Sequence, residues 1–488
     1  MEKIRARLLA FISSNKDVPL LAGFSIGLYM LLFYYSRNFA LANSWEQLLF
    51  FTGYYMLMPT ISILILYKLL GTLKLNALRT NLLFIAVIGF PSFFLLQINH
   101  VEFSKKIAFA VLLLAAIIVS RWARKYYKLL VILLLLMSAV NLPYFVTVLW
   151  VGITSSSDWK IQPDAIEKTV FTKRPNIYYI QPDGYTGFAN LKDSIHNFDN
   201  SGYEAFLKEN GFTLYPDYRS NYYSTLLSNS ATFSMKHHYF EDNVVEYAAR
   251  DVVMAYNPVL RIVKNNDYKT HFVTENPYLI INRPSNGYDY LNITYSELPF
   301  LKDGFSITRD VIGDFKKQAS KNAGQNFYFI EKFSPGHIAV YSAYSMGTEN
   351  EKTAYLERVQ EANIWLRDII GFIEKTDPDA LVIIGADHGG FAGFKNTLQC
   401  ETKTDNPQLV KSIFSAHLAI KWPGGSASGY DNGLKTGVNL FRSVFAFLSE
   451  DKGLLKHLQD DGSYIQLNDP QGDYRYIDNN GKVVFEKR

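Results

Sequence analysis

Acidic and histidine side chains follow three apolar stretches that have the length of β-strands. Asp183 follows "NIYYIQP", His337 follows "NFYFIEKFSPG", and the adjacent pair Asp387 and His388 follows "ALVIIGA". Two carboxylates and an imidazole that converge on one point suit a divalent cation such as Mn²⁺, Zn²⁺ or Mg²⁺. Each signal is weak when taken alone, because an Asp-Gly pair after a strand is usually a turn. Their combination and order along the chain make the pattern more specific.

A nucleophile for such a site is expected in residues 219–235, "RSNYYSTLLSNSATFSM", where a dense run of hydroxyl side chains leads into a helix. Hydroxyls at the start of a helix are normally N-caps, which accounts for one or two of them. A hydroxyl bound to a divalent cation has a lowered pKa and becomes a better nucleophile. The hydroxyl residues of this run include Ser220, Ser224, Thr225, Ser228 and Ser230.

The elements that must position these side chains read as strands alternating with helices. Apolar strands are expected at 177–180 and within 326–337, 380–390 and 415–425, and a hairpin with an Asn-Gly turn at 474–486. Helical patterns lie between them at Tyr203–Asn210, Pro258–Asn265 and Lys352–Lys375. The alternation predicts an α/β domain with a mostly parallel central sheet covered by helices. Ligands of such sheets bind at the carboxyl ends of the strands, where the acidic and histidine residues fall.

The first 150 residues have a different character, because five apolar runs follow one another with almost no polar face. The first, second, third and fifth runs reach the roughly 20 residues that a helix needs to cross a bilayer. The fourth run is shorter and reaches this length only with its flanking residues. We expect a five-helix transmembrane domain rather than buried helices of a soluble core or a cleaved signal peptide. The runs span residues 18–36, 46–71, 80–99, 107–120 and 128–150.

Basic residues predict how this domain is oriented. They concentrate before the first run and in the loops after the second and fourth runs, which predicts a cytoplasmic N-terminus. Five crossings would then place everything after residue 150 outside the cytoplasm. The predicted domains are a transmembrane domain at 1–150, a juxtamembrane linker at 151–173 and an extracytoplasmic domain at 174–488.

Composition adds two exclusions. The formal net charge of +4 is small for 488 residues and gives no reason to expect a nucleic-acid partner. Cys400 is the single cysteine, so the sequence excludes an intramolecular disulfide and a cysteine-based zinc cluster.

The motif order PDG, SNYxxTLLS, SPGH and ADHG resembles the sulfatase-like branch of the alkaline phosphatase superfamily. It is most similar to the membrane-bound lipoteichoic acid synthases and the phosphoglycerol or phosphoethanolamine transferases. The resemblance covers about residues 174–470, and the N-terminal spans fit the same group. The motifs are fairly specific for the superfamily and much less specific for the substrate.

The resemblance implies a role for each matching residue. Asp183, Asp387 and His388 would bind one divalent metal ion, and Thr225 would be both a metal ligand and the nucleophile. His337 would contact the transferred phosphate or the leaving oxygen. Asn221, which lies in the same motif as Thr225, would touch the phosphate.

Two departures from relatives narrow this interpretation. Cys400 lies in "QCETK", and Thr225 has no S-x-P-x-R context, so the formylglycine route of the sulfatases is closed. Phe333 and Ser334 occupy the region in which two-zinc phosphodiesterases carry an acid, and Glu331 lies earlier, which favours one metal. His417 is either an extra ligand or, as we expect, a hydrogen-bonded polar residue near the sheet end.

The expected function is a metal-dependent transferase that moves phosphoglycerol or phosphoethanolamine from a membrane phospholipid to a cell-surface glycan through a phosphothreonine. The expected location is the bacterial inner membrane, with the catalytic domain outside the cytoplasm. A metal-dependent phosphodiesterase or phosphatase is the first alternative, and a non-catalytic glycan-binding membrane protein is the second. The resemblance does not identify the head group, the acceptor or the metal.

Overall fold

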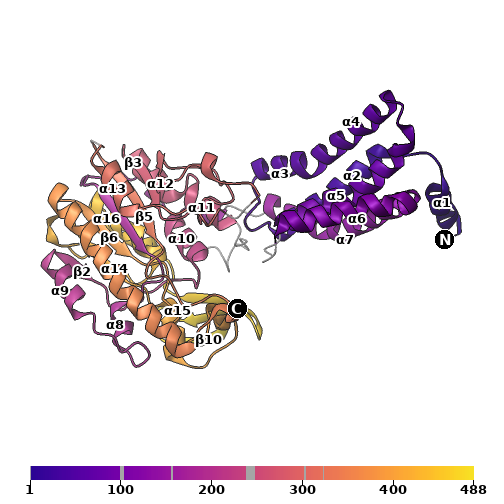
Figure 1. The fold of residues 1–488 in the computed structure, drawn as a ribbon. Coiled ribbons are helices and arrows are strands. Elements are labelled where there is room, and N and C mark those ends of the chain that lie inside the picture. The colour runs from indigo at the N-terminus through magenta and orange to yellow at the C-terminus, as the bar shows by residue number, and fades with distance from the viewer. Residues whose placement is uncertain (1, 99–103, 155–157, 238–247, 302–303, 322–323) are drawn as a thin grey trace. The chain divides into compact units, whose positions relative to one another are not determined.

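A computed structural model describes residues 2–98, 104–154, 158–237, 248–301, 304–321 and 324–488 of the chain (Figure 1). Residue 99 of the third apolar run and residues 155–157 of the predicted linker lie outside these ranges. The chain divides into two compact units. Unit 1 comprises Met1–Thr154, Ile281–Arg283 and Pro299–Asp303, and unit 2 comprises Ser155–Ile280, Pro284–Leu298 and Gly304–Arg488.

Unit 1 is built from helices. After the short α1 (Glu2–Ser13), helix α2 (Pro19–Arg37) packs against α4 (Met58–Thr72), α5 (Arg79–Ile98) and α7 (Tyr127–Thr154). Helix α3 (Trp45–Phe51) continues into α4 through a π-helical segment, and α6 (Lys105–Ala123) packs against α5.

Four helical stretches of the described chain are long and apolar enough to cross a membrane: Pro19–Arg37, Trp45–Thr72, Asn76–Ile98 and Lys105–Lys160. The last stretch includes both α6 and α7, which are separated by a 3₁₀ turn at Arg124–Tyr126. Helix α6 has 19 residues, so the flanks of the short fourth run complete it. Large apolar side chains such as Ile107 and Val140 are exposed on these helices, as expected for surfaces that face lipid. The number of crossings and their direction stay predictions.

Unit 2 contains a seven-stranded sheet in the order β2-β7-β6-β1-β5-β3-β4. Five adjacent strands run parallel to one another: β6 (Leu381–Gly385), β1 (Ile177–Pro182), β5 (Asn326–Lys332), β3 (Lys269–Thr274) and β4 (Tyr290–Leu291). At one edge, β7 (Leu418–Lys421) pairs antiparallel with β6, and β2 (Phe212–Leu214) pairs antiparallel with β7. The mostly parallel sheet confirms the predicted fold class.

Helices cover both faces of this sheet (Figure 1). On one face, Phe315 of α13 (Val311–Ala319) packs on Tyr178 and on Tyr328, and it also contacts α14 (Thr348–Thr376). On the other face, α10 (Thr225–Ser234) and α16 (Leu440–Ser449) direct aromatic rings onto Tyr179. Tyr178 and Tyr179 are neighbours in β1 and pack against helices on opposite faces of the sheet, because side chains alternate along a strand. The central strands are buried on both faces, which explains their continuous apolar sequence.

Further helices lie between the strands along the chain. They are α8 (Phe188–Leu191), α9 (Ser201–Glu209), α11 (Ala249–Met254), α12 (Pro258–Asn265) and α15 (Pro407–Phe414). A second sheet of three antiparallel strands comprises β8 (Ser463–Asn468), β9 (Gln471–Ile477) and β10 (Val483–Lys487). The hairpin expected at 474–486 corresponds to β9 and β10.

Part of the predicted linker belongs to unit 2. Ile166 and Phe171 are buried in the core of that unit, and the carboxylate of Asp164 pairs with the buried Arg442 at 2.7 Å. The prediction that residues 151–173 form a linker along the membrane surface is therefore wrong for these positions, because their side chains pack inside the α/β unit.

Candidate metal and phosphoryl-transfer site

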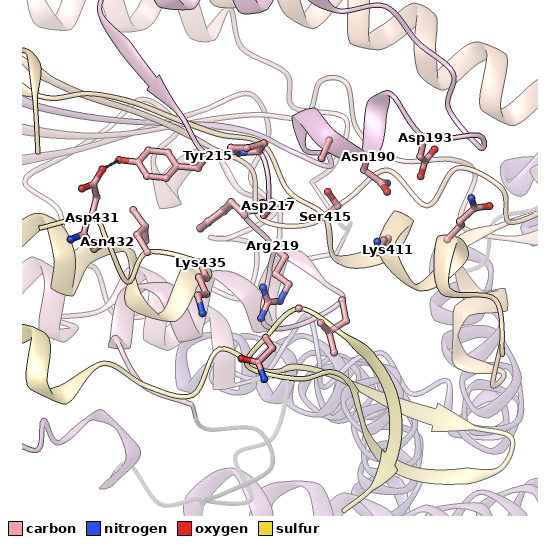
Figure 2. A pocket seen from close by; sticks show the side chains of 18 residues that line it. Asn190, Asp193, Tyr215, Asp217, Arg219, Lys411, Ser415, Asp431, Asn432 and Lys435 are labelled. Carbon is pink, nitrogen blue, oxygen red and sulfur yellow. Dashed lines mark hydrogen bonds between the residues drawn. The ribbon is translucent and has the colours of Figure 1, made fainter. Parts of the chain in front are cut away.

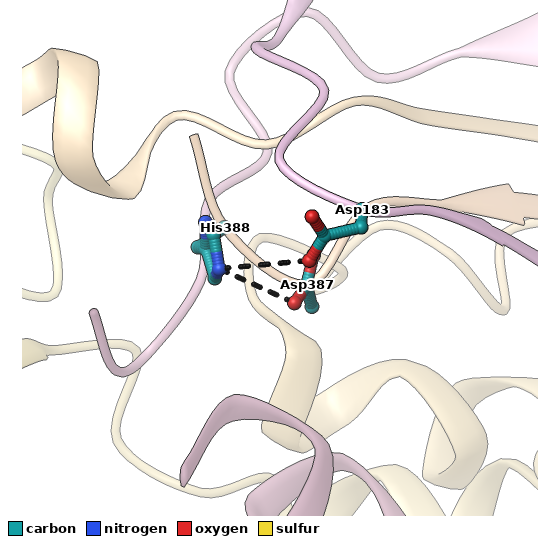
Figure 3. Close-up of side chains that lie close together, drawn as sticks. All are labelled: Asp183, Asp387 and His388. Atoms are coloured by element: carbon teal, nitrogen blue, oxygen red, sulfur yellow. Dashed lines mark ion pairs between the residues drawn. The ribbon is translucent and has the colours of Figure 1, made fainter. Parts of the chain in front are cut away.

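Three of the predicted residues form one buried cluster at the carboxyl ends of adjacent strands. Asp183 follows β1, and Asp387 and His388 follow β6, which pairs with β1 in parallel register. His388 Nε2 lies 3.4 Å from Asp387 Oδ2 and 3.9 Å from Asp183 Oδ1 (Figure 3). One ligand atom from each residue lies within 4.8 Å of the others. The parallel register of β1 and β6 is therefore what brings these residues together.

Thr225 completes the cluster. It is the first residue of α10, and its Oγ1 donates to Asp183 Oδ1 at 3.1 Å and lies 3.2 Å from His388 Nε2. The other hydroxyls of this helix bond to backbone carbonyls. Ser228 donates to Tyr222, and Thr232 donates to Ser228. This difference singles out Thr225 among the hydroxyl residues of the segment.

The donor set fits a divalent cation. Asp387 Oδ2 is buried and has no hydrogen-bond partner among the described residues, although an ionised carboxylate needs compensation when it is buried. His388 Nδ1 lies 2.8 Å from the carbonyl oxygen of Gly389, and donation of its proton there leaves the Nε2 lone pair facing the carboxylates. Two carboxylates, one imidazole and one hydroxyl are suitable ligands for Mn²⁺, Zn²⁺ or Mg²⁺.

The electrostatics of the cluster reflect its burial. Burial and the neighbouring Asp387 carboxylate raise the pKa of Asp183 to about 7. Burial alone would lower the pKa of His388, but the carboxylates of Asp387 and Asp183 raise it above its usual value. A cation at this position would compensate both carboxylates, so metal and protons compete for the same atoms.

His337 lies beside this cluster in a half-buried position. Its ring centroid is 6.0 Å from that of His388, and its Nδ1 lies 2.7 Å from the carbonyl oxygen of Ile338. Burial lowers the pKa of His337, and the nearby His388 lowers it further, so the ring is neutral near pH 7. Arg358 donates to the carbonyl oxygens of Pro335 and His337 and thereby holds this loop.

Asn221 is engaged elsewhere. Its amide nitrogen donates to the carbonyl oxygen of Gly462, and its amide oxygen accepts from the backbone of Val438. These contacts tie the segment before α10 to the C-terminal part of the unit. They do not support the predicted contact between Asn221 and phosphate.

The prediction for His417 needs correction. The ring is fully buried, and neither ring nitrogen has a hydrogen-bond partner among the described residues. It lies instead between the rings of Tyr185 and Phe188, with centroids 4.5 and 4.3 Å away. Burial lowers its pKa to about 3, so the imidazole packs as a neutral aromatic ring.

Tyr355 of α14 joins the two loops that carry the cluster. Its hydroxyl donates to the carbonyl oxygen of Gly184 at 2.9 Å and accepts from the backbone N–H of Thr186 at 3.0 Å. A Cβ on Gly390 would lie 2.1 Å from the Tyr355 ring, so the turn after His388 needs glycine there. In the sequence Tyr355 lies within a helical pattern, which gives no sign of this role.

Glycine is also required directly after Asp183. Gly184 has a φ of +64°, and a Cβ there would lie 2.3 Å from the carbonyl oxygen of Gly336. The backbone N–H of Gly336 in turn donates to the carbonyl oxygen of Asp183. The loops after β1 and β5 are therefore in backbone contact, and this contact brings His337 beside the cluster.

No protein-family model matches the chain, and no curated protein matches it in sequence. Among solved structures, it is similar to the integral membrane lipooligosaccharide phosphoethanolamine transferase A from Neisseria meningitidis. The identity is 12% and the TM-score 0.42, over 91% of this chain and 95% of that chain. A second match is the C-terminal periplasmic domain of EcEptC from Escherichia coli in complex with Zn, at 10% identity and a TM-score of 0.38. That match covers 57% of this chain and 82% of that one.

A third match is the phosphonate monoester hydrolase of Agrobacterium radiobacter, at 12% identity and a TM-score of 0.37, over 60% of this chain and 80% of that chain. The matched proteins thus include members of the group that the motif order resembles. The chain is thus similar to an integral membrane transferase, to a periplasmic domain and to a hydrolase.

Proposed function

We propose that the protein is a metal-dependent phosphotransferase that uses Thr225 as its nucleophile. The observation that carries this proposal is the position of Thr225 Oγ1, 3.1 Å from Asp183 Oδ1 and 3.2 Å from His388 Nε2. A hydroxyl that served only as a helix cap would bond to the backbone N–H groups of its own first turn. Thr225 instead contacts a carboxylate and an imidazole that arrive from two different strands.

One divalent ion would be held by Asp183, Asp387, His388 and Thr225. When bound, it would supply positive charge that favours the alkoxide of Thr225 and balances the phosphate oxygens. The residues of the chain do the remaining work. Asp183 Oδ1 accepts the Thr225 hydrogen bond and so orients the oxygen, and the N-terminus of α10 places a positive helix dipole beside the incoming phosphate.

The proposed reaction has two displacements at phosphorus. In the first, Thr225 Oγ bonds to the phosphorus of the donor diester, the bond to the donor alcohol breaks, and the hydroxyl proton of Thr225 leaves with that alcohol. In the second, an acceptor hydroxyl bonds to phosphorus, the Thr225 bond breaks, and the acceptor proton returns to Thr225. His337 is neutral and presents Nε2 as an acceptor, which suits the transient holding of this proton.

The proposed donor is a membrane phospholipid with a phosphoglycerol or phosphoethanolamine head group, and the proposed acceptor is a cell-surface glycan. The apolar helical stretches of unit 1 support a membrane-bound donor, because one span alone would anchor the protein irreversibly. In this proposal the protein resides in the bacterial inner membrane with its N-terminus in the cytoplasm and unit 2 outside.

The test uses the full chain in liposomes that contain phospholipids labelled in the head group. A transferase moves the label to an added glycan and releases diacylglycerol, and Thr225→Ala stops both. Release of a water-soluble labelled head group regardless of glycan would support the phosphodiesterase alternative. Absence of turnover with every lipid, in protein shown to contain metal, would contradict phospholipid transfer.

A further inference from the structure

A second feature lies at the same edge of the main sheet as the candidate site. It is a cavity of about 720 Å³, within the range of small-molecule sites (Figure 2). Leu418 at the start of β7 pairs with Gly385 at the end of β6, and Leu214 at the end of β2 pairs with Ala419. Tyr215 and Ser415, which line the cavity beside β2 and β7, therefore lie at the edge where β6 delivers Asp387.

The walls of the cavity are continuations of the loops that carry the site. The chain from β2 to α10 supplies Tyr215 and Arg219 and then reaches Thr225. The chain after β1 supplies Asn190 and Asp193. Ser415 also contacts the turn after His388, because a Cβ on Gly389 would lie 2.9 Å from its carbonyl oxygen. The cavity and the candidate site therefore share the chain segments after β1 and between β2 and α10.

Three buried polar atoms without partners belong to residues that line the cavity. Asn190 Nδ2 and Arg219 Nε are buried donors that have no hydrogen-bond partner among the described residues, and these residues are only 5% and 7% exposed. Asp193 Oδ2 is a buried acceptor in the same condition. An unpaired buried polar group destabilises the folded protein, so the walls of the cavity hold polar groups that the fold alone does not satisfy.

The chemistry of the walls indicates what such a ligand would be. Three cationic and three carboxylate side chains line the cavity, which leaves no excess of either charge: Arg219, Lys411, Lys435, Asp193, Asp217 and Asp431. A polyanion would be expected to select a cationic surface instead. The aromatic ring of Tyr215 is fixed at one wall, because its hydroxyl donates to Asp431 at 2.7 Å and accepts from Trp422 at 2.9 Å.

We infer that this cavity binds a neutral saccharide unit and that the saccharide is the acceptor of the transfer reaction. The role of the saccharide as acceptor rests on the proposed function, whereas saccharide binding rests on the cavity itself. Saccharide hydroxyls both donate and accept, so they suit walls that offer donors and acceptors, such as the Asn190 amide and the Asp193 carboxylate. The acceptor hydroxyl would then reach the phosphorus on Thr225 from the side of the β2–α10 loop.

The test is calorimetric titration of the full chain in detergent with maltose, cellobiose and N,N′-diacetylchitobiose, and with glucose 6-phosphate as an anionic probe. At least one neutral disaccharide is expected to bind. Asn190→Ala and Lys411→Ala should each weaken that binding by roughly tenfold, the loss expected for one ligand hydrogen bond. Lys208→Ala, an exposed lysine on α9 outside the cavity, is the matched control and should bind as the unchanged protein does.

The outcomes separate this inference from the proposed function when phospholipid cleavage is measured on the same unchanged protein. Cleavage without binding of any neutral disaccharide overturns the cavity inference alone. Binding that both cavity variants weaken, without cleavage of any phospholipid, supports the saccharide site and overturns the transfer reaction. Tighter binding of glucose 6-phosphate than of the disaccharides, or equal binding by both cavity variants, overturns the neutral saccharide site.

Discussion

Thr225 Oγ1 and His388 Nε2 lie 3.2 Å apart, although 163 positions separate the two residues along the chain. The helix start and the strand end that carry them are joined through Asp183, whose Oδ1 accepts the hydrogen bond of Thr225. This contact among three residues places a hydroxyl beside a carboxylate and an imidazole, which are groups that can bind a metal ion.

Thr225→Ala should abolish transfer, because the attacking oxygen is lost. Loss of a nucleophile typically costs several orders of magnitude in kcat. Thr225→Ser should keep measurable activity, and Thr232→Ala on the same helix should keep activity because its hydroxyl bonds to the Ser228 carbonyl oxygen. Head-group transfer in liposomes measures all three. Near-normal activity of Thr225→Ala would remove this residue from the mechanism, and Ser230 and Thr232 would be tested next.

Asp387→Asn should lower the metal content of the purified protein, since an amide is a weaker ligand than a carboxylate for a hard cation. Elemental analysis of the unchanged protein should find about one divalent ion per chain, as the donor set predicts. Asp377→Asn is the control. The Asp377 carboxylate accepts hydrogen bonds from Asn176, which precedes β1, and from Tyr178, which lies within β1. Two tightly bound ions per chain would contradict the single site.

Tyr355→Phe should reduce kcat by about tenfold and leave metal content unchanged. The substitution removes the hydroxyl that bonds to Gly184 and Thr186 and thereby loosens the loop that carries Asp183. Tyr344→Phe, on an exposed residue, is the control. A rate for Tyr355→Phe equal to that of the control would show that the hydroxyl does not position the site.

Glu331→Gln should stabilise the protein increasingly as the pH rises. Burial and the nearby Asp183 raise the pKa of Glu331 well above its usual value, and Thr274 donates to its carboxyl group. Because the folded state holds this proton and the unfolded state releases it above about pH 4.5, the unchanged protein loses stability by about 1.4 kcal/mol per pH unit from this group.

The measurement is thermal unfolding of the two proteins in detergent at pH 5 and pH 8. The variant has no proton to release at this position, so its advantage in Tm should be small at pH 5 and larger at pH 8. An advantage that is equal at the two pH values, or that shrinks, would show that Glu331 is ionised in the folded protein.

The topology of unit 1 is testable with engineered cysteines, because the single native Cys400 is buried. In intact cells, a membrane-impermeant maleimide should label Lys208→Cys on exposed α9 and should spare Lys74→Cys in the loop after the second apolar stretch. Both should be labelled after the membrane is permeabilised. Labelling of Lys74→Cys in intact cells would reverse the predicted orientation.

The buried strands were the most predictable elements. Strands β1, β5 and β6 are apolar on both faces, so continuous runs of residues such as "LVIIG" identify them. Strand β3 was missed because "KTHFVT" mixes polar and apolar residues, and β4 has only two residues. Helices at Tyr203–Asn210 and Pro258–Asn265 were predicted within a residue or two of α9 and α12.

The site was predictable where it depends on strand ends and not where it depends on packing. Parallel neighbours explain why Asp183, Asp387 and His388 meet. No sequence pattern shows that the amide of Asn221 is held by Gly462. Nor does one show that His417 packs between aromatic rings and makes no side-chain hydrogen bond within the described part of the chain. These outcomes depend on contacts between segments far apart in the chain, which local periodicity does not encode.

The backbone contact between Gly184 and Gly336 has a consequence for how activity is acquired after synthesis. The site needs the strand ends of β1, β5 and β6 and the start of α10, and these segments are distributed from residue 177 to residue 388. Contacts between segments so far apart form late, because the entropy of closing long loops must be overcome first. The proposed activity would therefore be absent until the chain from residue 177 to residue 388 had been made and had folded, so that activity would report the folding of this part of unit 2.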